Sequence, residues 1–576
     1  GIIPPGNDTV TVGDIERTRL NHIKILFFVG VNDGVVPKAG NQGGIISQFE
    51  REKMAEYHLE LAPGAREKVF IQKFYLYLNM TKPSERLYVT FCRVNSDGKA
   101  LRRSYLIGTL LKLFPQLVVE EPSEEETLEG VLTAESALPF LMEGLNKPVE
   151  DEEAWTALLA WYLSDEGDRE KALQLFDAAF GVHQDDAISK AVTKALYGNT
   201  LDNSVTRLEQ FAACAFAHYL SYGLRLRERE LQQFASVDMG NIYHDVLERF
   251  AKGIEMSEYT WFDISQEAQD ALLSQSMEDA IAGSGIGDVF EDARNSYLLK
   301  RMETTAKRTI WALMLQVRKG KFVPSGFEVS FSRAERLDAV QFQLGEDEKM
   351  RLRGRIDRID TYETDDKVYV KIIDYKSGNT SFSLLNFYYG LQLQLVVYMN
   401  VALELTKKIY KGKDTEPAGI FYYHITDPMV DSDGGESEEE IRRSILEQLK
   451  VGGLVNEDPE IYGAMDTDFT GTSSVIPVAL KADGSLKAAS KTASAYEFGL
   501  MSDYVRKKIE HVGKEIFAGN VSVKPYLLGD RSGCDYCPYH TICGFDVRMP
   551  GFSYQQFEKF DSSEEILAHI REEVED

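Results

Sequence analysis

Two short segments within residues 354–378 combine carboxylates with a lysine. GRIDRID contains Asp357, and IIDYKSG contains Asp374 and Lys376. Hydrolysis of a phosphodiester with Mg²⁺ requires oxygen ligands for the cation and a positive charge near the phosphate, and these residue types supply both. On a strand, Asp374 and Lys376 point to the same face. The carbonyl of Tyr375, which lies between them, is a candidate third ligand.

The alternative for these segments is a surface hairpin that carries an aspartate and a lysine by chance. A bare D-x-K pattern favours this alternative. Here, however, the apolar run VYVKIID leads directly into the charged residues, and charge at the end of a buried strand is costly unless it is paired or functional. We expect Asp357 to end one strand and Asp374 to lie on the next, so that a hairpin brings both carboxylates to one ion.

Cysteines form a second candidate site, which is split along the chain. Cys534, Cys537 and Cys543 cluster in CDYCPYHTIC, one thiolate short of a tetrahedral set, and Cys214 in FAACAFAHY is a candidate fourth. An iron–sulfur cluster or zinc could take these four ligands. The alternative for Cys214 is a buried structural thiol, and Cys92 is interpreted in that way.

Two predicted helices flank the carboxylate segments. In GNIYHDVLERF, Gly240 is predicted to open a helix with His244 one turn in, and in YGLQLQLVVYM, Gln394 and Tyr398 share one helical face. A structural histidine and a half-buried helix edge are the respective alternatives.

The hydrophobic pattern predicts an α/β chain. Residues 21–38 predict a buried strand followed by a turn, and residues 66–93 predict a helix and then the strand ERLYVTF. Residues 116–200 are predicted to be helical and acidic. Beyond Leu201, helices alternate with strands of period two, and residues 427–500 have no clear period and predict an insertion or lid with short elements.

Composition sets outer limits on the class of protein. A chain of 576 residues predicts several domains, and no stretch is long and apolar enough to span a bilayer. Five cysteines predict a reducing compartment rather than a disulfide scaffold. The net charge of −28 argues against a surface that grips DNA everywhere, although a local basic channel is compatible with it. The opening GIIPPGNDTV, without Met, predicts a piece of a longer protein.

The series GxxxH, GRIDRID, DYKSG and QxxxY, in this order, resembles the RecB-type branch of the PD-(D/E)XK nucleases. The resemblance implies that His244, Asp357, Asp374 and the Tyr375 carbonyl bind Mg²⁺, with Mn²⁺ or Ca²⁺ as substitutes. It also implies that Lys376 is catalytic, together with Asp357 and Asp374, and that Gln394 and Tyr398 position the DNA strand.

The split cysteines resemble the iron–sulfur staple of AddB-type and Cas4-type nucleases. This resemblance implies a [4Fe–4S] cluster on Cys214, Cys534, Cys537 and Cys543, with Zn²⁺ as the alternative. Closing so long a loop removes chain entropy worth about 5 kcal/mol beyond a constant term. The implied task of the cluster is to hold the domain closed.

The N-terminal third resembles the second RecA-like domain of superfamily 1 helicases, with degenerate ATP motifs. Thr81, Lys82 and Pro83 stand where active helicases have V-A-x-T-R-A, and a lysine lacks the fork of the arginine. With no G-x-x-x-x-G-K-[ST] in the chain, ATP hydrolysis by this segment is not expected.

Together these resemblances imply a four-part α/β chain of the AddB type. The parts are a partial RecA-like helicase domain (1–115), an acidic helical connector (116–200), a RecB-type PD-(D/E)XK nuclease domain with a mixed central sheet flanked by helices (201–550, insertion 427–500) and an acidic C-terminal tail (551–576). The implied function is exonuclease cleavage of the 5′-ended strand at DNA breaks, in the bacterial cytoplasm, with an AddA-type helicase–nuclease subunit as heterodimer partner. The alternative is a catalytically silent scaffold or DNA-binding subunit.

Overall fold

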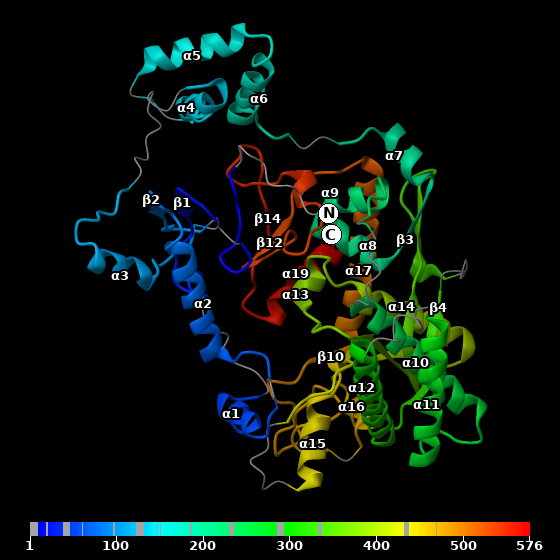
Figure 1. Ribbon diagram of the computed structural model, residues 1–576. Coiled ribbons are helices and arrows are strands. Elements are labelled where there is room, and N and C mark those ends of the chain that lie inside the picture. The colour runs from blue at the N-terminus through cyan, green and yellow to red at the C-terminus, as the bar shows by residue number, and fades with distance from the viewer. Residues whose placement is uncertain are drawn as a thin grey trace. The chain divides into compact units, whose positions relative to one another are not determined.

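The structure is a computed structural model of the 576-residue chain (Figure 1). It describes all residues except 1–9, 19–20, 39–45, 60, 96–97, 122–131, 147, 150, 185–186, 228, 230–235, 285–292, 332–336, 431–436, 468 and 576. The chain divides into two compact units, Gly1–Ala172 and Leu173–Asp576. None of the described helices is both long and apolar enough to cross a membrane.

The first unit contains a small parallel sheet and several helices. Strands β1 (Ile25–Phe28) and β2 (Arg86–Val89) pair in parallel, which confirms the two predicted strands. The predicted burial of the first strand is wrong, because Ile25 is 45% and Phe27 64% exposed. Two strands have too few neighbours in this unit to cover both faces. The helices are α1 (Gln48–Glu56), α2 (Ala65–Met80), α3 (Tyr105–Leu113), α4 (Ala134–Asn146) and α5 (Glu152–Ser164).

The second unit is built on a mixed six-stranded sheet in the order β11-β10-β9-β8-β7-β4. Its central strand β8 (Lys367–Lys376) pairs antiparallel with β7 (Arg355–Glu363) and parallel with β9 (Asp414–His424). The near-continuous apolar sequence of β8 suits a strand that is covered on both faces. The outer strands are β4 (Val323–Ser330), β10 (Gly452–Asn456) and β11 (Thr492–Ala493).

Helices cover both faces of this sheet (Figure 1). On one face, α8 (Val205–Ala213), α14 (Gln394–Ile409) and α17 (Ala495–Ala518) pack on strand residues such as Val370 and Ile372. On the other face, α10 (Ser236–Met256), α11 (Gln266–Gly283) and α12 (Ala293–Arg318) pack on Ile373 and Tyr375. The side chains of β8 therefore alternate between two cores, and its last residues emerge between the two helical layers.

Three predicted segments differ in detail from the structure. Residues 427–500 form α15 (Glu438–Gln448) and α16 (Pro459–Met465) and also supply β10 and β11 to the main sheet. The acidic end of the chain forms α19 (Ser563–Glu575), which buries Ile566 and Ile570 in the core shared with α17. The single helix predicted around 387–405 is two helices, α13 (Leu384–Tyr388) and α14. Between them Gly390 has φ +80°, a conformation that glycine adopts readily.

The remaining elements connect and flank these layers. Two three-stranded sheets are formed by β3 (Thr200–Asn203), β5 (Gln341–Gln343) and β6 (Lys349–Leu352), and by β12 (Tyr526–Leu528), β13 (Arg531–Ser532) and β14 (Gln555–Gln556). Helix α6 (Arg169–Phe180) crosses the boundary between the units. The short helices are α7 (Lys190–Tyr197), α9 (Ala215–His218), the π-helix Tyr219–Gly223, the 3₁₀ turn Asp338–Val340 and α18 (His540–Cys543).

Candidate functional site

The carboxylates of the two motif segments adjoin on neighbouring strands. Asp357 is the third residue of β7 rather than the end of a strand as predicted, and Asp374 lies near the end of β8. Because these strands are antiparallel, with Arg358 opposite Ile373, the two aspartates still come together. The backbone N–H of Tyr375 donates to Asp357 Oδ2 at 2.7 Å and fixes that carboxylate.

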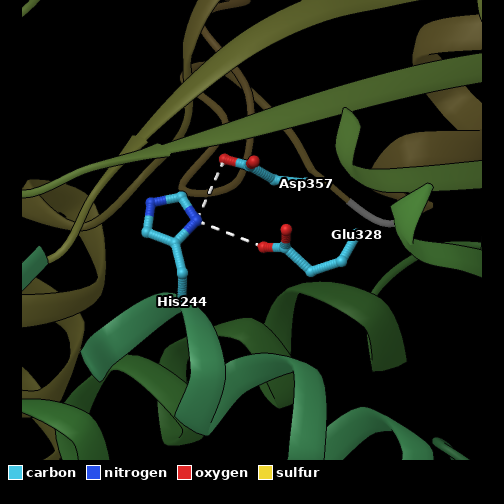
Figure 2. Close-up of side chains that lie close together, drawn as sticks. All are labelled: His244, Glu328 and Asp357. Atoms are coloured by element: carbon cyan, nitrogen blue, oxygen red, sulfur yellow. Dashed lines mark hydrogen bonds and ion pairs between the residues drawn. The ribbon is translucent and has the colours of Figure 1, made fainter. Parts of the chain in front are cut away.

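A histidine and a further carboxylate approach Asp357 from other elements. Figure 2 shows His244 of α10 pointing at Glu328 of β4 and at Asp357. His244 Nδ1 lies 3.2 Å from Glu328 Oε1 and 3.5 Å from Asp357 Oδ2. Among the described residues, these three form the only group of histidine, cysteine or acidic side chains whose ligand atoms all lie within 4.8 Å of one another.

Glu328 is the residue that sequence reasoning missed. The available signal was a glutamate inside the predicted strand VPSGFEVSF, where a buried charge needs a partner. Its backbone φ is +48°, which is uncommon for a residue other than glycine and is typical of functional or strained positions. The Glu328 carboxylate also forms an ion pair with Arg355.

Lys376 and the two helical residues form a second layer of contacts around Asp374. Lys376 Nζ lies 2.6 Å from Asp374 Oδ2 and donates to Gln394 Oε1 at 3.2 Å. The amide nitrogen of Gln394 donates to Asp374 Oδ1 at 2.9 Å and to the Tyr398 hydroxyl at 3.1 Å. The structure thus brings Asp374, Lys376, Gln394 and Tyr398 together, while Asp374 stands outside the close group of His244, Glu328 and Asp357.

The glycine of the GxxxH motif has a packing reason rather than the predicted one. Helix α10 begins at Ser236, so Gly240 lies inside the helix and does not open it. A Cβ at Gly240 would come within 3.2 Å of Ser377 Oγ, in the loop that follows Lys376. The small residue therefore lets α10 approach the end of β8, which places His244 beside Asp357.

The electrostatics of the site favour a bound cation. Burial, followed by the neighbouring Asp374 charge, raises the pKa of Asp357 to about 7, and burial also raises the pKa of Asp374. Burial lowers the pKa of His244, but its hydrogen bond to Glu328 and the charge of Asp357 outweigh this, so its pKa is raised. Carboxylates that resist ionisation next to one another are relieved by a metal ion, and they bind it in their ionised form. The donor set of oxygen and imidazole ligands therefore fits a divalent metal.

A buried ion network lies behind the site on the same strands. Arg358 is 2% exposed and donates to both carboxylate oxygens of Asp360 at 2.6 and 2.9 Å, and Lys371 Nζ lies 2.9 Å from Asp360 Oδ2. The two cations and one anion hold β7 and β8 together with bidentate geometry. The second aspartate of GRIDRID thus supports the strands that carry the first.

The four predicted cysteines converge at a second location. Cys214, which follows α8, is buried in a cluster with Tyr539 and Cys537. Burial raises the pKa of Cys214, and burial together with the neighbouring Cys214, Cys537 and Cys543 thiols raises the pKa of Cys534 to about 11. Segments from both ends of the domain therefore bring their thiols into electrostatic contact. Cys92 is exposed in the first unit, contrary to the prediction of a buried thiol.

The fold and the carboxylate site define a class of protein that comparison with known families confirms. Residues 203–544 match the PD-(D/E)XK nuclease superfamily, which is more than half of the chain. The chain therefore belongs to the PD-(D/E)XK nuclease superfamily.

Similar proteins extend this result to the whole chain. It is 38% identical over 586 residues to the B subunit of the ATP-dependent helicase/deoxyribonuclease of Lachnoclostridium phytofermentans. It is 32% and 34% identical to the proteins of the same name from Thermoanaerobacter sp. and Alkaliphilus metalliredigens, over 582 and 580 residues. In each case the alignment covers 100% of this chain and 50% of the relative, so the chain spans about half the length of the curated relatives it matches.

Proposed function

We propose that the second unit is a metal-dependent deoxyribonuclease, working within a helicase–nuclease subunit that processes double-strand DNA ends. The observation that carries this proposal is the convergence of Asp357, Asp374 and Lys376 at adjoining strand ends, with His244 and Glu328 beside them. The superfamily match and the printed names of the relatives support the same conclusion.

Each residue of the centre has a chemical task in this proposal. His244, Asp357, Asp374 and the Tyr375 carbonyl would hold Mg²⁺, with Glu328 as an additional carboxylate. A bound divalent ion would polarise the phosphate and favour deprotonation of the attacking water. Lys376, held 2.6 Å from Asp374, supplies positive charge where negative charge develops on the phosphate oxygens. Gln394 and Tyr398 fix Lys376 and Asp374 and are suited to contact the strand being cut.

We also propose that the cysteines bind a [4Fe–4S] cluster rather than a zinc ion. Zinc–sulfur bonds of about 2.3 Å bring four tetrahedral sulfurs within about 3.8 Å of one another. In the part of the chain that the structure describes, no three of the sulfurs lie within 4.8 Å of one another. The wider spacing suits a larger, polynuclear centre. An absorbance band in the blue part of the spectrum, lost on oxidation, tests for iron–sulfur against the colourless zinc protein.

The wider setting follows from the relatives and is proposed for the whole protein. The 5′-ended strand is cut as it is fed to this centre by an AddA-type partner, in the bacterial cytoplasm. The first unit has lost its own ATP hydrolysis, because Lys82 replaces the forked arginine that active helicases use.

Cleavage of end-labelled single-stranded DNA in the presence of Mg²⁺ tests the proposal. The protein should cut, and the Asp374→Ala variant should not. Asp365→Ala is the matched control, because Asp365 is exposed in the turn that joins the same two strands, and this variant should cut normally. Absence of cleavage by all three proteins, with the cysteine centre loaded and the AddA-type partner present, would reject the nuclease assignment in favour of a scaffold role.

A further inference from the structure

A polar pocket lies in the second unit beside the cysteine centre. It has a volume of about 570 Å³ and is formed by the end of α7, strand β3, helix α8 and the π-helix with the residues that follow it. The π-helix runs directly on from α9, which begins one residue after Cys214. The nuclease chemistry described above uses none of the residues in this pocket.

Two buried polar atoms in the pocket wall lack partners. Asn203 and His218 are each 2% exposed, and both line the pocket. Among the described residues, the Nδ2 of Asn203 and the Nε2 of His218 have no hydrogen-bond partner. Burial, followed by the charge of Arg207, lowers the pKa of His218 to about 4, so the imidazole is neutral near pH 7. A buried polar group without a partner is costly, and a ligand that satisfies it gains from doing so.

Aromatic rings and arginines share the same pocket. The guanidinium of Arg207 lies 4.5 Å from the ring centroid of Tyr222, and the rings of Tyr222 and Tyr197 lie 5.2 and 6.3 Å from His218. Arg225 and Arg227 are exposed at the rim. The carboxylate of Asp202 is paired with Arg351 and Arg353, so it does not cancel these charges. In a chain of net charge −28, this concentration of arginine indicates an anionic ligand.

The backbone around the pocket has features that are frequent at functional sites. The π-helix Tyr219–Gly223 is closed by the bond from Leu224 N–H to the Tyr219 carbonyl, and Arg225 has φ +58°. The Tyr539 hydroxyl donates to the Leu226 carbonyl at 3.0 Å and accepts from Ser221. Tyr539 lies between Cys537 and Cys543, so the cysteine segment holds the pocket rim in place.

We propose that this pocket binds one nucleotide, either as a unit of the DNA strand or as a free mononucleotide. The tyrosine rings stack on the base, Asn203 and His218 bond to its polar edge, and Arg225 and Arg227 contact phosphate. Stacking aromatics combined with a basic rim are the usual means of holding single-stranded nucleic acid. The strand-bound form rests on the proposed deoxyribonuclease function and adds to it a place where the strand is held away from the cutting centre.

Binding of a fluorescein-labelled, mixed-sequence single-stranded oligodeoxynucleotide to the full protein tests the pocket. Anisotropy is measured without added divalent ions, so that no cleavage occurs, and over a range of salt concentrations. The Arg225→Ala/Arg227→Ala double variant should bind about tenfold more weakly, and its salt slope should fall by about 1.4, from about 0.7 per lost phosphate contact on a single strand. The control is Arg442→Ala/Arg443→Ala, two exposed arginines of α15 with the same change in charge.

A second pair of variants tests stacking without altering charge. Tyr222→Ala should weaken binding about tenfold, whereas Tyr222→Phe should bind as the native protein does, because it keeps the ring. Competition with deoxyadenosine monophosphate distinguishes the two sources of the nucleotide. If it binds with pocket dependence while oligonucleotide affinity is unchanged in every variant, the ligand is a free nucleotide.

The proposal is overturned if the pocket variants match the native protein in affinity for both probes and in salt slope. It is also overturned if the α15 control loses as much as the rim variant, because the effect would then be one of net charge. Mg²⁺-dependent cleavage by each variant is measured separately. Intact cleavage with unchanged binding rejects the pocket alone, and pocket-dependent binding without cleavage rejects the nuclease function alone.

Discussion

The carboxylate centre and the cysteine centre of the second unit are built on opposite principles. The carboxylates lie on neighbouring strands of the central sheet, and both Asp357 and Asp374 are less than a tenth exposed. The cysteines lie on loops and short helices, and Cys534, Cys537 and Cys543 are partly exposed. Rigid strands suit chemistry that requires fixed positions, whereas a link between distant loops suits the closing of a domain.

The largest effect is expected from breaking the cysteine centre. Cys537→Ser removes one ligand of the proposed cluster and releases the closure between Cys214 and the C-terminal loop. We expect the free energy of unfolding of the second unit to fall by about 5 kcal/mol, the loop-closure entropy for several hundred residues. Denaturant unfolding followed by circular dichroism measures this, together with the visible absorbance.

Cys92→Ser is the matched control for this variant, because Cys92 is exposed in the first unit. It should leave both the absorbance and the unfolding of the second unit unchanged. A Cys537→Ser protein that keeps its full stability would show that the staple does not hold the domain closed.

The reverse effect is expected from Lys376→Ala. The variant loses the charge next to Asp374 and the bond to Gln394, so we expect cleavage to slow by about 10²–10³-fold, the usual loss on removing one group that stabilises developing charge. The visible absorbance and the unfolding midpoint should be unchanged. Single-turnover cleavage of labelled DNA measures the rate, and Lys371→Ala would be an unsuitable control because Lys371 is tied to Asp360.

A third expectation is that a metal ligand destabilises the protein without its metal. The pKa of Asp357 is about 7 in the folded protein and about 3.9 in the unfolded chain, so the folded state holds the proton more tightly. Stability is therefore lost as pH rises from about 4 to 7 and stays low above that. Without divalent ions, Asp357→Asn should be more stable than the native protein by roughly 3 kcal/mol at about pH 8.

Thermal unfolding at several pH values checks this expectation. The advantage of Asp357→Asn should shrink as the pH is lowered toward about 4. It should also shrink when Mg²⁺ is added, because the ion binds the folded native protein. An advantage that is independent of pH would assign it to packing rather than to the buried charge.

The sequence was sufficient where chemistry and periodicity coincide in one segment. The apolar alternation around Asp374 and Lys376 predicted both the strand and the face they share, because the side-chain period of a strand is fixed. The convergence of Cys214 with Cys534 came from a resemblance to a known family, since spacing alone cannot show which distant loops meet. The superfamily match confirms the predicted fold, and the individual site roles stay predictions.

Other features could not be predicted because they depend on tertiary contacts. Glu328 is one glutamate in a weakly patterned strand, and only the sheet order β8-β7-β4 and the approach of α10 place it against His244. The acidic tail became α19 because Ile566 and Ile570 find an apolar surface on α17, which the local charge conceals. The exposure of Phe27 likewise depends on which elements cover β1 and not on its own apolar sequence.

The smallest expected effect tests whether the two centres are connected. Glu209 lies on α8, which ends one residue before Cys214, and its Oε1 accepts the backbone N–H groups of Leu393 and Gln394 at 2.7 and 3.1 Å. A carboxylate at this position stabilises the start of α14, the helix that presents Gln394 to Asp374 and Lys376. Helix α8 therefore joins the cysteine loop to the residues that hold the catalytic lysine.

Glu209→Ala should slow cleavage about tenfold, a typical loss for a residue that orients the groups around a metal site. Glu209→Gln should restore most of the rate, because its amide oxygen can accept the same two bonds. The visible absorbance of both variants should remain that of the native protein. If Glu209→Gln is as slow as Glu209→Ala, the negative charge near Lys376 matters rather than the acceptor. If neither variant slows cleavage, α14 keeps its position without α8, and the two centres are energetically independent.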